Sequence, residues 1–103
     1  MIQASFTRAA QGFTAFEVTG HAGFAPAGED VVCASVTSAV QLTANGITEI
    51  LGVPATVLVE ENKVSLTLPP FPQEGAREFL QALYLHFTLL EQEYPQHITV
   101  SEV

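Results

Sequence analysis

Apolar and polar residues alternate in two short runs at the start of the chain. Successive side chains of a β-strand point to opposite faces, so each run predicts a strand with one buried face. Three residues, Ala-Gln-Gly at positions 10–12, separate the runs and predict an opening β-hairpin. The alternating apolar positions are Ile2, Ala4, Phe6, Phe16 and Val18.

The same alternation returns between residues 57 and 68, with a tight turn expected near Glu61-Asn62-Lys63. It predicts a second hairpin. Its apolar positions are Val57, Val59, Val64, Leu66 and Leu68. Ile98 and Val100 predict a last short strand.

Two other stretches carry apolar residues at helical spacing, and a proline follows each of them. Gly52 and Pro54 are expected to end the first helix, and Pro95 the second. The apolar positions of the first are Val32, Val36, Val40, Ile47 and Ile50. Those of the second are Ala76, Phe79, Leu80, Leu83, Phe87 and Leu90.

The predicted order is ββαββαβ. Short connections favour antiparallel strands with both helices on one sheet face, which is an α+β two-layer sandwich with a mostly antiparallel sheet. At 103 residues, without repeats or linkers, the chain is expected to be one domain, 1–103.

Composition narrows the class of partner. Apolar residues make up 48% and charged residues 14%, a globular composition. Eleven acidic residues against three basic ones give a formal charge of −8. The negative electrostatic field of such a charge disfavours direct binding of nucleic acid and attracts basic proteins or peptides.

The single cysteine cannot form an internal disulfide, which fits a reducing compartment. The start MIQASFTR lacks the basic-then-apolar order of a signal peptide. Residues 31–48 carry no charge, but their polar side chains argue against a membrane span. We expect a cytoplasmic protein that is not bound to a membrane.

The segment between the second strand and the first helix contains the candidate chemistry. Asp30 stands just before the helical run and is expected to be its N-cap, with Cys33 in the first turn. There the positive end of the helix dipole would favour the thiolate. His21 ends the strand and is suited to removing the thiol proton.

A loop rich in small residues joins this histidine to the cysteine and could act as a lid. Its expected flexible positions are Gly20, Gly23, Pro26 and Gly28. The acids Glu29 and Asp30 raise the pKa of a nearby thiol but also favour imidazolium, so their net effect stays open.

Each candidate also has a purely structural interpretation. A cysteine among Val and Ala is commonly a small core residue, and a histidine after glycine a turn residue. A zinc site from His21, Cys33 and an acid lacks paired ligand spacing, and no metal or other cofactor is expected. For His86 and His97, surface or core-edge roles are favoured over catalysis.

The chain resembles the ribosomal-processing cysteine protease family, Prp, over nearly its whole length. The specific part is a GHA motif, the loop, and DVVCA where the family has DIVCA. The matching residues are Gly20, His21, Ala22, Glu29, Asp30, Val31, Val32, Cys33, Ala34, Thr37 and Asn45.

The resemblance implies that Cys33 is the nucleophile and His21 its base. Asp30 matches the family's aspartate and either caps the helix, which its position favours, or orients His21; Thr37 stands where a serine is usual. It further implies a homodimer that removes the N-terminal extension of a basic ribosomal protein, number twenty-seven of the large subunit. Two other functions stay open: a non-enzymatic dimeric adaptor for a ribosomal protein or assembly factor, and a thiol redox sensor.

Overall fold

The computed structural model describes residues 1–20, 27–71 and 75–103, and only the backbone of residues 27–30. In chain order the elements are β1 (Ile2–Ala9), β2 (Gly12–Thr19), α1 (Ala27–Asn45), the π-helical turn η1 (Gly46–Ile50), β3 (Thr56–Glu60), β4 (Lys63–Thr67), α2 (Ala76–Glu93) and β5 (Ile98–Glu102). The predicted order ββαββαβ is confirmed.

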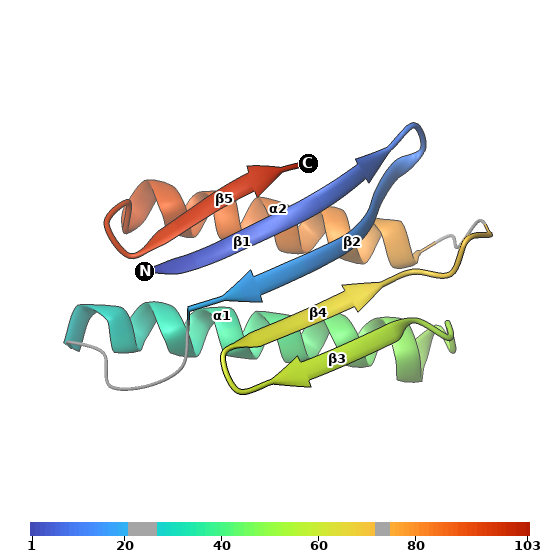
Figure 1. The fold of residues 1–103 in the computed structure, drawn as a ribbon, viewed down its shortest axis with the longest axis horizontal. Helices are drawn as coiled ribbons and strands as arrows, with labels where there is room; N and C mark the ends of the chain where they lie inside the picture. Colours follow the sequence, from blue (N-terminus) through green and yellow to red (C-terminus); the bar gives the residue numbers. More distant parts are fainter. Residues whose placement is uncertain (21–26, 72–74) are drawn as a thin grey trace.

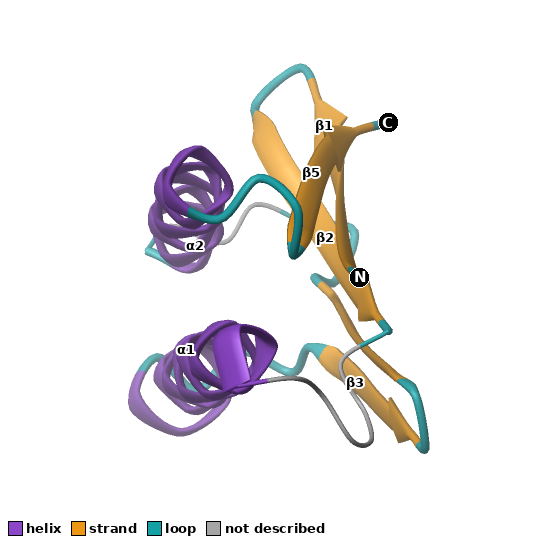
Figure 2. Ribbon diagram, turned by 90° about the vertical axis from the view of Figure 1, so that its left-hand side faces the viewer, coloured by secondary structure: helices purple, strands orange, loops and turns teal. Residues whose placement is uncertain are grey.

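The five strands form one sheet in the order β3-β4-β2-β1-β5 (Figure 1). All neighbouring pairs are antiparallel except β1 and β5, which are parallel because β5 follows a helix and not a tight turn. Both helices cover the same face of the sheet (Figure 2). The predicted two-layer α+β architecture is confirmed, and it places β3 and β5 at the two sheet edges.

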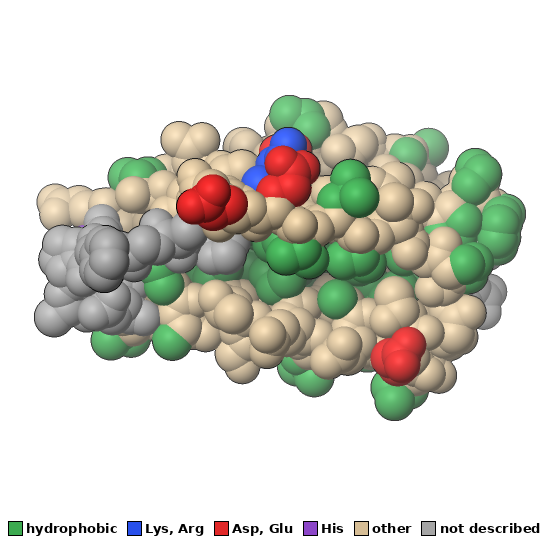
Figure 3. Space-filling model, turned by 60° about the horizontal axis from the view of Figure 1, so that its bottom comes forward, with side chains coloured by type: hydrophobic (Ala, Val, Ile, Leu, Met, Phe, Trp, Pro, Cys, Tyr) green, Lys and Arg blue, Asp and Glu red, His purple; other side chains and the backbone are tan. Residues whose placement is uncertain are grey.

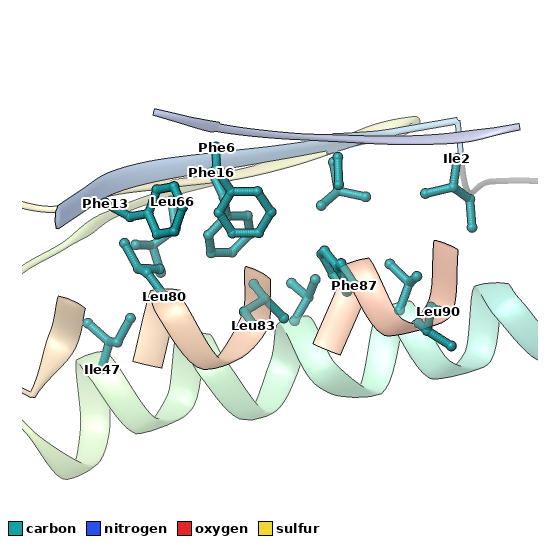
Figure 4. Packing of buried hydrophobic residues seen from close by; sticks show 14 of the residues in the cluster. Ile2, Phe6, Phe13, Phe16, Ile47, Leu66, Leu80, Leu83, Phe87 and Leu90 are labelled. Carbon is teal, nitrogen blue, oxygen red and sulfur yellow. The ribbon is translucent and has the colours of Figure 1, made fainter. Parts of the chain in front are cut away.

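The core lies between the sheet and the helices (Figure 4). Phe6 is fully buried, with its ring centroid 5.3 Å from that of Phe13 and 5.2 Å from that of Tyr84. Burying such a side chain contributes about 1.5–3 kcal/mol. Phe13 and Phe16 both point inward although they stand three residues apart, because the β1–β2 register shifts between Thr7 and Arg8.

Helix α2 follows its predicted apolar face closely. Five of the six predicted positions are buried and Phe79 is partly buried against the core. The helix ends at Glu93, just before Pro95, as expected from the missing amide hydrogen of proline.

The first predicted helix differs from expectation at its C-terminal end. Val32, Val36, Val40 and Ile47 are buried, but Ile50 is 81% exposed. The backbone changes at Gly46 to π-helical geometry, in which the amide of Leu51 donates to the carbonyl of Gly46, five residues earlier, at 2.9 Å. The wider turn rotates Ile50 away from the core, so its predicted burial was wrong.

Residues Val31–Ile50 are long and apolar enough to cross a membrane, judged by length and composition alone. The apolar face of this segment packs against the sheet of the same chain and so forms part of the core. This is the usual property of a core helix in a two-layer domain.

Candidate active site

Cys33 is the seventh residue of α1 and packs, partly buried, against the edge of the core. A helix turns about 100° per residue, so Cys33 and Ala39 lie on opposite sides of the buried Val36. Ala39 and Leu42 line a hollow between α1 and α2. Cys33 therefore occupies the other flank of α1, which faces away from α2 and toward β3.

Thr37 follows Cys33 by one helical turn and so lies on the same flank. It is exposed. The structure thus brings this pair of predicted site residues together along one side of α1.

Strand β3 forms the opposite wall. Val57 and Val59 pair with Leu66 and Val64, so their side chains point to the helix-covered face of the sheet. Yet they remain 38% and 76% exposed. Figure 3 shows this side of the molecule, with hydrophobic side chains along a hollow between the two walls. We call this the α1–β3 groove.

Gly20 forms a closely packed corner at the end of β2. Its φ is +83°, and a Cβ atom there would lie 2.3 Å from the carbonyl oxygen of Met1. Its amide donates to the carbonyl of Asn62, in the β3–β4 turn, at 3.3 Å. Gly20 was predicted as part of the flexible loop, but its contacts show a fixed anchor directly before His21.

The other loop predictions fall in different places. His21, Gly23 and Pro26 lie outside the described residues. Gly28 was predicted in the loop but belongs to α1, which begins at Ala27. The signal for this earlier start was present, because proline is favoured at the beginning of a helix.

The early start also moves Asp30 and Cys33 relative to the helix end. Asp30 is the fourth residue of α1, so its predicted position as N-cap was wrong. Cys33 was predicted in the first turn and lies beyond it, where the helix dipole has largely faded. The helix end therefore favours a thiolate at Cys33 less than the sequence predicted.

The same shift places the unpaired amides of the helix start further from Cys33 along the helix axis. Only the first four amides of a helix lack partners within it, here those of residues 27–30. They precede Cys33 by three to six residues, or roughly 4–9 Å along the axis.

The two remaining histidines stand apart from the groove. His86 is exposed on α2 and lines the α1–α2 hollow. His97 is partly buried before β5, where its amide donates to the carbonyl of Tyr94 at 3.0 Å. The surface and core-edge locations predicted for them are confirmed.

Residues 1–99 match the model of the family described as cysteine protease Prp. The chain belongs to this family of cysteine proteases. It is 29% identical over 108 residues to the ribosomal processing cysteine protease Prp of Bacillus subtilis, covering 98% of this chain and 96% of that protein.

Solved structures agree with the fold. The ribosomal processing protease Prp from S. aureus, in complex with a substrate peptide, superposes with a TM-score of 0.92 at 19% identity, covering all of both chains. The protein SMU.848 from Streptococcus mutans superposes with a TM-score of 0.91 at 24% identity, covering 100% of this chain and 97% of that one.

Proposed function

We propose that this protease is an endopeptidase in which Cys33 is the nucleophile and His21 the general base and acid. The observation that carries the proposal is the place of Cys33. The only cysteine of the chain lies partly buried on the flank of α1 that borders the α1–β3 groove. A partly buried position on this flank leaves one side of Cys33 against the core and the other toward the groove.

The anchor at Gly20 supports the role of His21. Gly20 is held between Met1 and Asn62, at the end of the sheet where the β3–β4 turn lies (Figure 1). His21 is its covalent neighbour, so its point of attachment is fixed by the sheet. A general base must reach the thiol proton, and a fixed point of attachment limits the positions that it has to sample.

The proposed reaction proceeds in two halves. His21 takes the proton of the Cys33 thiol, and the thiolate sulfur bonds to the scissile carbonyl carbon. The peptide C–N bond breaks as His21 returns the proton to the leaving amine, which leaves a thioester on Cys33. His21 then deprotonates water, the hydroxide adds to the thioester, and the C–S bond breaks to release the acid and regenerate the thiol.

The proposed substrate is the N-terminal extension of large-subunit ribosomal protein number twenty-seven. Support comes from the B. subtilis and S. aureus relatives, both described as ribosomal processing proteases. The formal charge of −8 favours encounter with a basic ribosomal protein. The homodimer that the resemblance implies, and the cytoplasmic location expected from the sequence, remain part of the proposal.

Incubation of the protein with that ribosomal protein from the same organism, followed by intact-mass analysis, tests the function. We expect the ribosomal protein to lose one N-terminal fragment, and alkylation of Cys33 to prevent the loss. A substrate that keeps its mass would contradict the proposal. Stable binding without cleavage would instead support the adaptor function.

A further inference from the structure

Strand β3 is an edge strand whose outward main-chain groups can be identified. Asn62 and Leu68, which flank β4, mark the residues that bond toward β2, since the carbonyl of Asn62 accepts from the amide of Gly20 and the amide of Leu68 donates to the carbonyl of Thr14. Antiparallel pairs alternate in bonding direction. The odd-numbered residues of β4 therefore bond toward β3.

The β3–β4 register then shows which residues of β3 bond to β4 and which point to the open edge. The residues that face Lys63, Ser65 and Thr67 are, in turn, Glu60, Leu58 and Thr56. The main-chain groups of Val57 and Val59 consequently point to the open edge and present two N–H donors and two carbonyl acceptors. The side chains of this valine pair also border the α1–β3 groove.

Among the residues that the structure describes, this edge lacks the usual protection. Proteins shield edge strands with proline, charge, a bulge or a covering segment. The sequence Thr-Val-Leu-Val-Glu has one charge at its end and no proline, its pairing with β4 is continuous, and all five residues are exposed. A strand of this kind normally pairs with another strand.

We propose that the peptide substrate binds as an additional strand on the open edge of β3. This inference rests on the proposed function and specifies how the substrate is held. A strand added there places every second side chain on the helix side, along the flank of α1 that carries Cys33. Both the hydrogen bonds and the apolar contacts of the groove are then used by one extended segment.

A peptide explains the edge better than a second copy of the protein. A proteolytic substrate must lie extended beside the nucleophile, and the groove lies between β3 and the flank of α1 that holds Cys33. Pairing of two β3 strands from two copies would bury the same valines and close the groove to a substrate.

N-methyl scanning of the substrate tests the pairing without changing the protein. The probe is a synthetic peptide that spans the cleavage site of ribosomal protein number twenty-seven from the same organism, methylated at one backbone nitrogen at a time. Methylation of a peptide amide that faces β3 should lower kcat/KM roughly three- to tenfold. Methylation of an intervening amide should lower it less than threefold. A flat profile, or one without a period of two, would overturn the proposal.

Val59→Pro removes one outward N–H and leaves the β3–β4 ladder intact, since proline is tolerated on the open side of an edge strand. Val59→Ala is the matched control, which shortens the side chain and keeps the N–H. We expect the proline variant to lose at least threefold more kcat/KM than the alanine variant, at equal thermal stability. Equal losses would count against edge pairing.

Two further readouts separate the alternatives. If Val59→Pro changed the molar mass in light scattering and left peptide kinetics unchanged, β3 would be an interface between copies and the proposal would fail. If the unmodified peptide were cleaved but its N-methyl profile were flat, only the binding mode would be refuted. An unmodified peptide that is never cleaved would refute the proposed function first.

Discussion

The two flanks of α1 differ in how they are used. Toward α2, a hollow separates part of the two helices, but the η1 turn that continues α1 packs closely, since a Cβ on Gly46 would lie 2.6 Å from the ring of Phe79. Toward β3 the helix leaves a groove in which Val57 and Val59 stay exposed. One helix thus stabilises the fold on one side and presents the proposed nucleophile on the other. Changes on the α2 side should affect stability, and changes on the β3 side activity.

The sharpest test compares one residue from each flank. Cys33→Ala should lower kcat/KM by about a thousandfold or more, because the nucleophile is lost. Ser35→Ala, toward α2, should leave activity within a factor of two. Steady-state kinetics on the ribosomal substrate measures both. Residual activity above a few per cent in Cys33→Ala would contradict the proposal that Cys33 is the nucleophile.

Gly20→Ala should cost about 2–4 kcal/mol in free energy of unfolding, because it combines a positive φ with a collision against the Met1 carbonyl. It should also reduce activity in the protein that remains folded, since His21 follows it. Gly12→Ala is the matched control: its φ is also positive, +128°, but the nearest atom would be 3.7 Å away. Denaturant unfolding measures both variants. If Gly20→Ala and Gly12→Ala lost the same free energy of unfolding, Gly20 would not be a fixed corner.

Gly46→Ala should destabilise the fold by about 1–3 kcal/mol through overpacking against Phe79, with kcat/KM of the folded protein unchanged. Phe79→Leu should recover part of the loss when combined with it, which a double-mutant cycle measures. If the stability losses of Gly46→Ala and Phe79→Leu were additive, the ring of Phe79 would not be what opposes the added Cβ.

Asp30→Asn should lower kcat/KM about tenfold or more in a protein of nearly normal stability. Since Asp30 is not the N-cap, we infer that it orients His21. Removing its charge from the first helical turn should cost only about 0.3–1 kcal/mol. Full activity with a large loss of stability would restore a capping role.

The smallest effect concerns the charge of the whole molecule. Raising ionic strength from 0.05 to 0.5 M should reduce kcat/KM for the whole basic ribosomal protein several-fold, because the field is screened. A short neutral peptide should respond less than twofold. Identical salt responses would exclude electrostatic attraction of the substrate.

The sequence by itself determined most of the residues that form the core. Alternation placed Ile2, Ala4 and Phe6 on the buried face of β1, and helical spacing did the same for α2. These patterns are reliable because burial repeats with the period of the element. The motif around His21 and Cys33 also identified the protease family, which the family match confirmed.

Only the tertiary structure decided where regular geometry changes and which surfaces remain uncovered. The bulge that buries Phe13, the π-turn that exposes Ile50 and the start of α1 at Ala27 all break a simple period. The open edge of β3 was equally hidden, since Val57 and Val59 alternate like core residues. Periodicity reports which face of an element is apolar, whereas coverage of that face depends on helices and strands distant in the chain.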